Sequence, residues 1–376
     1  MAEAAGSAAG VLIPPRMWAG AFLLTGTTNT GGRWNAARAE NGPESAFAAG
    51  IGTETTSTVE GGPRMQFPAA ARERIAIASY PFREFIVGRN DHAGNGGAGG
   101  NSEEERKSGV GPSWGGGVSG TAAGHKAGGG KMDLKDFAAH VSAKFNIKKI
   151  EPWSEHFRSL AQGYLEELRA AVAQAGGAIV NIAVDGEHSP YSADAAERER
   201  AIAFSKQWID VAVAIGSPSV RTNIPPAKGA KPDVERTAES LRRVAEYGAA
   251  KNVVVNLEND NPASEDPFFL VKVIEKVNSK WLHALPDFAN TLAAYEEEYA
   301  YRGIEAMFGH AYNISHVKET EVGDGKDKIA HVDLPRTFGI AKKHRYKGYF
   351  SMEWDSPGDP YAGTAGLIEK TLKNLA

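Results

Sequence analysis

Short hydrophobic segments alternate with longer amphipathic ones along the chain from Arg74 to the C-terminus. The short segments have the length and the β-branched content of strands, and the longer ones repeat apolar residues at helical spacing. The pattern predicts strands at 74–80, 147–153, 178–186, 217–224, 252–259, 284–290, 313–319 and 348–354. It predicts helices between them, at 134–145, 160–175, 193–215, 234–250, 267–278, 292–308, 335–344 and 364–375.

Strands that alternate with helices are typical of a parallel α/β fold, and eight such pairs predict a (β/α)8 TIM barrel. In this barrel the carboxyl ends of all the strands converge on one face, where enzymes with this fold hold their active sites. Polar residues at the predicted strand ends are therefore the first candidates for function.

Four predicted strands carry an acidic or imidazole side chain near their ends: Glu258, Asp287, His316 and Glu353. Carboxylate oxygens and one imidazole suit a divalent ion such as Mn²⁺, Mg²⁺, Co²⁺ or Zn²⁺. Strand alternation places Glu258 in the barrel interior, where an ionised carboxylate is costly unless it is paired or coordinates a metal. Each acid alone could form a structural salt bridge, but the shared strand-end position favours one divalent metal centre.

Two carboxylates beside a metal ion favour a particular class of reaction. An ion that chelates a carbonyl and the neighbouring hydroxyl acidifies the carbon-bound proton, and a carboxylate on either side can remove or return it. This chemistry is aldose–ketose isomerisation or ketose epimerisation through an enediolate.

The motifs at these strand ends resemble those of the sugar phosphate isomerase/epimerase superfamily, the xylose isomerase-like barrels that include ketose 3-epimerases. They are Leu257-Glu258-Asn259, Pro286-Asp287, His316-Val317-Lys318 and Ser351-Met352-Glu353, with SYPF at 79–82 and IEPWSEHF at 150–157. The resemblance covers residues 72–376. It implies that Glu258, Asp287, His316 and Glu353 bind the metal and that Glu258 and Glu353 are also the catalytic acid/base pair.

Two positions depart from the pattern of the family's epimerases. Those enzymes commonly carry a His three residues after the strand-six Asp and an Arg about six residues after the strand-seven His. This chain has Asn290 and Val322 at those positions. Because both positions usually help to hold the sugar, the resemblance implies the metal set but no particular ketose.

Further residues near the strand ends are candidates for substrate contacts: Glu151, Trp153, His156, His188, Arg221, Asn223 and Lys318. An indole can cover the apolar face of a sugar ring, and a guanidinium can hold a carboxylate or phosphate by two hydrogen bonds. Structural alternatives are that Trp153 packs on a helix, that Arg221 pairs with a barrel acid and that His156 begins a helix.

The leading hypothesis is a metal-dependent isomerase or epimerase of a sugar or sugar-like polyol. One alternative is a dehydratase or lyase that acts on a keto-inositol-like substrate with the same site. Another is a non-catalytic barrel that keeps the metal and binds a sugar. Apurinic endonucleases share the superfamily but use more His ligands and a basic surface, which this chain lacks.

Composition limits the partners. The 376 residues carry a net charge of −4 and no dense basic block, so nucleic acid is not expected. No apolar run approaches the roughly 18 residues that span a bilayer, so no membrane partner is expected either. The absence of Cys excludes disulfides, thiolate catalysis and Cys-based metal sites. We expect a small carbohydrate as the partner and leave a homo-oligomer open.

Two segments fall outside the barrel pattern. Residues 1–70 are rich in Ala, Gly and Thr and are expected to form a disordered extension ahead of a barrel domain at 72–376. The apolar stretch 17–25 after Arg16 weakly resembles an export signal, but its charged region is poor and a cytoplasmic location is expected. The Gly-rich insertion 93–131 is expected to be a mobile loop, or a lid, on the catalytic face. It holds no phosphate-binding motif, so no nucleotide cofactor is expected.

Overall fold

The computed structural model describes residues 61–89, 131–260, 264, 266–322 and 329–376. Our predictions for residues 1–60, including the export-like stretch, and for the Gly-rich residues 93–130 lie outside this range. No helix in the described part is long and apolar enough to cross a membrane.

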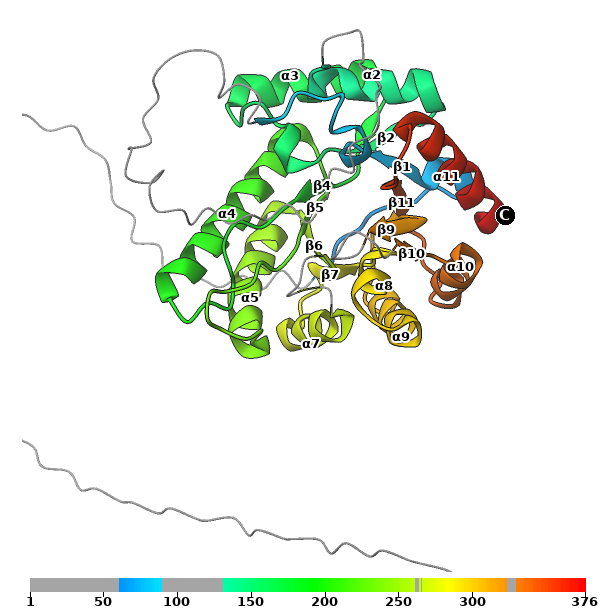
Figure 1. Ribbon diagram of the computed structural model, residues 1–376. Helices are drawn as coiled ribbons and strands as arrows, with labels where there is room; N and C mark the ends of the chain where they lie inside the picture. The colour runs from blue at the N-terminus through cyan, green and yellow to red at the C-terminus, as the bar shows by residue number, and fades with distance from the viewer. Residues whose placement is uncertain (1–60, 90–130, 261–263, 265, 323–328) are drawn as a thin grey trace, which may run out of the picture. The chain divides into compact units, whose positions relative to one another are not determined.

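Parallel strands form a barrel at the centre of the described chain (Figure 1). Hydrogen bonding joins them in the orders β3-β2-β1-β11-β8 and β4-β5-β6-β7. Single parallel bridges between Trp153 and Ala183 and between Asp287 and His316 connect the two groups and close the ring. The strands are β1 (Ile75–Ala78), β2 (Lys149–Glu151), β3 (Ala178–Ile179), β4 (Ile182–Val184), β5 (Ser219–Thr222), β6 (Val254–Glu258), β7 (Leu282–Leu285), β8 (Ile314–Val317) and β11 (Tyr349–Met352).

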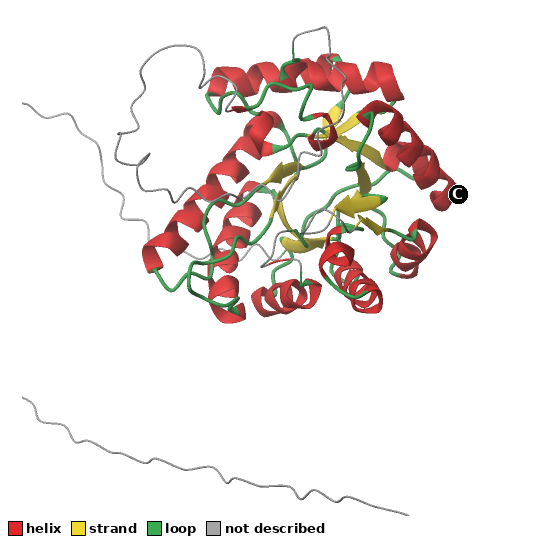
Figure 2. Ribbon diagram, viewed as in Figure 1, coloured by secondary structure: helices red, strands yellow, loops and turns green. Residues whose placement is uncertain are grey.

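Helices surround the barrel on its outside (Figure 2). Six of the described helices begin directly after an Asp whose side chain accepts a backbone N–H, which caps the first turn. The helices are α2 (Leu134–Phe145), α3 (Gln162–Gln174), α4 (Ala195–Ile215), α5 (Val234–Lys251), α7 (Pro267–Val277), α8 (Asn290–Ala294), α9 (Glu297–Phe308), α10 (Leu334–Lys343) and α11 (Pro360–Leu375). The predicted (β/α)8 fold is confirmed.

Several predicted boundaries were wrong for local reasons. The predicted strand 178–186 is divided, because β3 pairs with β2 whereas β4 pairs with β5. The predicted strand 284–290 lies two residues earlier, as β7, and ends before Pro286, which has no N–H for a ladder. Extended backbone at Tyr295 divides the predicted helix 292–308 into α8 and α9. A hairpin of β9 (Thr320–Val322) and β10 (Ile329–His331) was not predicted.

Apolar side chains fill the layer between the strands and the helices. Ile75 and Ile77 of β1 are fully buried there, together with Val255 and Leu257 of β6. The alternate positions of the same strands point into the barrel and include polar residues such as Asn256 and Glu258, both buried. The strand pattern thus separates an apolar outer core from a polar interior that leads to the candidate site.

Residues 61–70, which we assigned to the disordered extension, instead pack against the barrel. The backbone N–H of Met65 donates to the Tyr312 hydroxyl at 3.0 Å, and this hydroxyl donates to the carbonyl of Pro63 at 2.9 Å. The ring of Phe67 lies edge-on to Tyr312 and Tyr349. Since Tyr312 and Tyr349 lie at the amino ends of β8 and β11, this segment covers the end of the barrel opposite the strand carboxyl ends.

Candidate metal centre

Four buried side chains meet at the carboxyl ends of neighbouring strands. Each offers one ligand atom, and these four atoms lie within 4.8 Å of one another. No member is more than 3% exposed. The strand pairing explains the convergence, because β6, β7, β8 and β11 are consecutive around the barrel and each supplies one member. The members are Glu258, Asp287, His316 and Glu353.

His316 lies at the centre of this group. Its Nδ1 is 2.6 Å from Oε1 of Glu258 and 3.3 Å from Oε2 of Glu353. Its Nε2 is 3.0 Å from both carboxylate oxygens of Glu151. Burial alone would lower the pKa of His316, but the Glu151, Glu258 and Glu353 carboxylates raise that pKa well above its usual value.

Asp287 presents one oxygen with no hydrogen-bond partner. Its Oδ1 accepts the backbone N–H groups of Ala289 and Asn290, both at 2.8 Å. Its Oδ2 is buried and unpartnered among the described residues, with Nζ of Lys318 3.8 Å away. Burial raises the pKa of Asp287 to about 6, although the Lys318 ammonium opposes this. A divalent ion would satisfy this oxygen, so the residues present fit a metal.

Glu258 uses its second oxygen to hold Arg221. Nε of Arg221 is 2.5 Å from Oε2 of Glu258, and its Nη1 is 2.7 Å from Oδ1 of Asp185. Burial raises the pKa of Glu258, while Arg221 and His316 oppose this. Arg221 is 4% exposed, and its guanidinium already has two acidic partners. The geometry therefore fits the structural alternative, in which Arg221 pairs with a barrel acid.

Lys318 places an ammonium group beside the cluster. Nζ lies 2.8 Å from Oδ1 of Asn290, 2.8 Å from Oε2 of Glu321 and 3.4 Å from Oε2 of Glu353. Burial would lower the pKa of Lys318, but Asp287, Glu321 and Glu353 raise it well above its usual value. Burial would raise the pKa of Glu353, but the nearby His316 and Lys318 outweigh it and hold that pKa far below the usual range.

Trp153 and His156 lie near the end of β2, where the chain turns through a short 3-10 helix, η4 (Ser154–His156). The indole Nε1 of Trp153 donates to Oδ2 of Asp185 at 2.8 Å, and the ring lies edge-on to Tyr80 and His156. His156 is buried, with Nδ1 2.8 Å from the Ser79 hydroxyl. Of this pair, only Trp153 keeps exposed surface.

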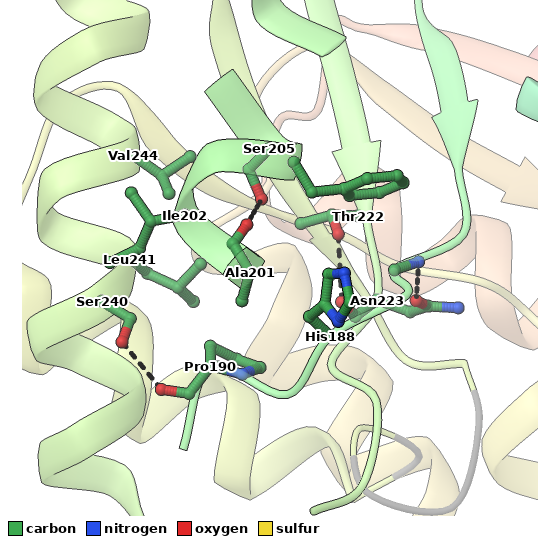
Figure 3. A pocket seen from close by; sticks show the side chains of 12 residues that line it. His188, Pro190, Ala201, Ile202, Ser205, Thr222, Asn223, Ser240, Leu241 and Val244 are labelled. Carbon is green, nitrogen blue, oxygen red and sulfur yellow. Dashed lines mark hydrogen bonds between the residues drawn. The ribbon is translucent and has the colours of Figure 1, made fainter. Parts of the chain in front are cut away.

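His188 and Asn223 are not part of the cluster. Both line a small pocket between the barrel and helices α4 and α5, together with apolar residues such as Ile202 and Leu241 (Figure 3). Nδ1 of His188 lies 3.1 Å from Oε1 of Glu197 on α4. The Asn223 amide accepts the Gly186 N–H and donates to Asp260.

Sequence reasoning missed several residues that shape the site. Asp185 joins Trp153 to Arg221, and Tyr80 packs against Trp153. Both stand at the ends of predicted strands, so applying the strand-end rule to every strand would have found them. Glu321 could not be found in this way, because it belongs to the unpredicted β9–β10 hairpin.

The family described as "Xylose isomerase-like TIM barrel" matches residues 139–374. The chain belongs to this family. The match confirms the resemblance that the strand-end motifs indicated. No curated protein matches the sequence.

Solved structures share the fold at low sequence identity. An L-ribulose 3-epimerase aligns with a TM-score of 0.54 and 18% identity over 64% of this chain and 89% of its own. D-psicose 3-epimerase with D-tagatose from Clostridium cellulolyticum H10 aligns with a TM-score of 0.51 and 16% identity over 65% of this chain and 92% of its own. A xylose isomerase-like TIM barrel protein from Mycobacterium smegmatis, in complex with magnesium, aligns with a TM-score of 0.50 and 20% identity over 66% of this chain and 93% of its own.

Proposed function

We propose that this protein is a metal-dependent isomerase or epimerase of a sugar or a sugar-like polyol. The observation that carries the proposal is the convergence of three buried carboxylates and one imidazole within 4.8 Å at the catalytic face of the barrel. Family membership and the similarity in fold to sugar 3-epimerases support the same reaction class.

The cluster would hold one divalent ion, Mn²⁺, Mg²⁺, Co²⁺ or Zn²⁺, through Glu258, Asp287, His316 and Glu353. Buried carboxylates need compensating partners, and Oδ2 of Asp287 has no hydrogen-bond donor among the described residues, with the Lys318 ammonium 3.8 Å away. When bound, the ion would supply Lewis acidity toward a substrate carbonyl.

Glu258 and Glu353 would transfer the proton. They extend from β6 and β11, which are separated around the barrel by β7 and β8, so they approach the centre from different sides. One carboxylate would remove the proton next to the substrate carbonyl, and the other would return a proton from its own side. One oxygen of each carboxylate lies near Nδ1 of His316, at 2.6 Å for Glu258 and 3.3 Å for Glu353, so both reach the same part of the site.

Among the predicted substrate contacts, Trp153 and Lys318 fit that role best. Trp153 is partly exposed and packs against Tyr80, which in turn interacts electrostatically with Lys318 and Glu353. The indole would cover the apolar face of a sugar, and the ammonium would contact a substrate oxygen. His156, His188 and Asn223 remain weaker proposals, because they are buried or lie beside the α4–α5 pocket.

A product screen tests the proposal. The protein is freed of metal, reloaded with Mn²⁺, and incubated with ketoses, aldoses and keto-inositols, and the products are analysed by mass spectrometry and chromatography. We expect at least one isomeric product of unchanged mass, formed only with metal. Loss of one water would instead identify the dehydratase alternative. Binding of a sugar without any product would identify the non-catalytic barrel.

A further inference from the structure

Glu151 is a fully buried carboxylate inside the barrel. It ends β2, yet it contacts His316 of β8, and the strands β1 and β11 lie between these two in the sheet. The contact therefore crosses the barrel interior. Glu151 is 0% exposed, and both of its oxygens already face His316, so its contacts are with the protein itself.

A chain of hydrogen bonds holds the Glu151 carboxylate in place. Nδ2 of Asn181 donates to Oε1 of Glu151 at 2.7 Å. The Asn181 oxygen accepts from the hydroxyl of Ser219 at 2.5 Å, and this hydroxyl accepts from Nδ2 of Asn313 at 2.8 Å. Because its oxygen is already bonded, Asn181 can present only its N–H to Glu151. The position of the carboxylate is thus set without help from His316.

This arrangement determines which His316 nitrogen keeps its proton when the ring binds a metal. An ionised carboxylate can only accept hydrogen bonds, and both Glu151 oxygens lie 3.0 Å from Nε2, so Nε2 carries a proton. Without metal, Nδ1 can also donate, to Glu258 at 2.6 Å. A metal that lies among Glu258, Asp287 and Glu353 would take the place of the Nδ1 proton, and the ring would then keep only the proton on Nε2. Carboxylates that bond to the outer nitrogen of a metal-bound His orient the ring in the same way.

We propose that Glu151 is a positioning residue, which fixes the His316 ring with its proton on Nε2 and its Nδ1 toward the metal. This role replaces the substrate contact predicted from the sequence, and it rests on the proposed metal centre. The inference makes Glu151 a determinant of metal affinity although it touches neither metal nor substrate.

The test combines NMR of the imidazole with metal titration. The protein is labelled with ¹⁵N-histidine, and the His316 signals are assigned by comparison with His316→Gln. In wild-type protein we expect a proton on Nε2 both without metal and with Mg²⁺ bound, and an unprotonated Nδ1 with Mg²⁺. In Glu151→Gln, whose amide can donate to the ring, we expect loss of the Nε2 proton and Mg²⁺ affinity weaker by about 10–100-fold.

Two further variants make the result specific. Glu166→Gln makes the same substitution on the exposed face of α3 and should leave both readouts unchanged. Asn181→Ala keeps the carboxylate but removes the N–H that holds it, so it should weaken Mg²⁺ binding by less than Glu151→Gln. If Glu151→Gln does not fold, the protonated nitrogen in the wild-type spectra and the Mg²⁺ affinity of Asn181→Ala still test the proposal.

Two results would overturn the proposal: a proton on Nδ1 in the Mg²⁺-loaded wild type, or wild-type Mg²⁺ affinity in folded Glu151→Gln. Failure of the proposed function looks different. In that case the wild type binds no divalent ion, while a metal-free spectrum recorded at a pH where the ring is neutral still shows whether Glu151 holds the proton on Nε2.

Discussion

The side-chain amide of Asn259 bonds to both the backbone N–H and the backbone carbonyl of Asp287. Its Oδ1 accepts the N–H at 2.8 Å, and its Nδ2 donates to the carbonyl at 3.1 Å. Because Asn259 directly follows Glu258, this pair of hydrogen bonds joins the ends of β6 and β7. Each of these ends carries one candidate ligand, Glu258 or Asp287. The spacing of these ligands therefore depends on a residue that is not itself a ligand.

Asn259→Ala should loosen this junction. The buried N–H and carbonyl of Asp287 would lose their partners, which costs about 1–3 kcal/mol in the free energy of unfolding. Mn²⁺ affinity should also fall, by about 10–100-fold, because the ligands lose their fixed spacing. Urea unfolding and calorimetric titration measure the two effects. Asn374→Ala, which removes an exposed hydrogen bond from a side-chain amide in α11, is the control. Unchanged Mn²⁺ affinity in Asn259→Ala would show that the amide serves the fold alone.

Asp287→Asn should remove the metal while the barrel stays folded. The Asn oxygen can still accept the two backbone N–H groups that Oδ1 now accepts, but an amide nitrogen replaces the unpartnered Oδ2. We expect Mn²⁺ affinity to fall by more than the roughly 100-fold upper range of outer-shell changes. Metal analysis and circular dichroism check this, with Asp136→Asn on the exposed side of α2 as the control. Wild-type metal content in Asp287→Asn would place the metal elsewhere.

Metal binding should release a proton near neutral pH. Although burial opposes it, the surrounding carboxylates raise the pKa of His316, so the metal-free ring keeps its second proton to higher pH than a free imidazole does. A metal ligand must be neutral imidazole, so protons compete with the ion and the apparent affinity must rise with pH. Calorimetry in buffers of different ionisation enthalpy should find about one proton released per ion. Affinity that does not change with pH, with no proton release, would contradict this.

Lys318 and Glu321 should be energetically coupled. Both side chains are largely buried and their charged atoms lie 2.8 Å apart, so Lys318→Met would leave Glu321 without its partner. We expect a loss of about 3–5 kcal/mol in the free energy of unfolding. The double variant Lys318→Met/Glu321→Gln should recover part of this loss, because the buried acid is also removed. Strictly additive losses in urea unfolding would show that the two residues act independently.

The strand-end rule located the candidate ligands from sequence because their positions follow from local pattern alone. Glu258 ends the run Val253 to Leu257, and the carboxyl ends of parallel strands meet on one face whatever the details of the fold. Apolar residues at helical spacing located most of the helices. The structure adds that a capping Asp precedes six of the described ones.

Roles that depend on contacts across the barrel could not be predicted. Glu151 stands at a strand end like the ligands, but its partner His316 is 165 residues away and on a non-adjacent strand. The sequence likewise showed that Asn290 stands where the family's epimerases commonly have a His. Only the structure shows that the Asn290 amide accepts a hydrogen bond from the Lys318 ammonium. Such pairings follow from the stagger of the strands and from side-chain length, which hydrophobic periodicity does not reveal.

The central claim is that Glu258 and Glu353 transfer a carbon-bound proton beside one divalent ion. The most direct test is deuterium incorporation from heavy water into the substrate found by the product screen, with wild-type, Glu258→Gln and Glu353→Gln proteins loaded with metal. A Gln oxygen can still coordinate, but its amide cannot act as a base. Glu166→Gln is again the control.

We predict that both Gln variants at the site retain metal and lose up to about 10⁴-fold in exchange rate, while Glu166→Gln exchanges like the wild type. A metal-loaded Glu353→Gln protein that exchanges the proton at the wild-type rate would contradict the two-carboxylate account. A metal-loaded wild-type protein that exchanges no proton of any ketose, aldose or keto-inositol would contradict the proposed isomerase itself.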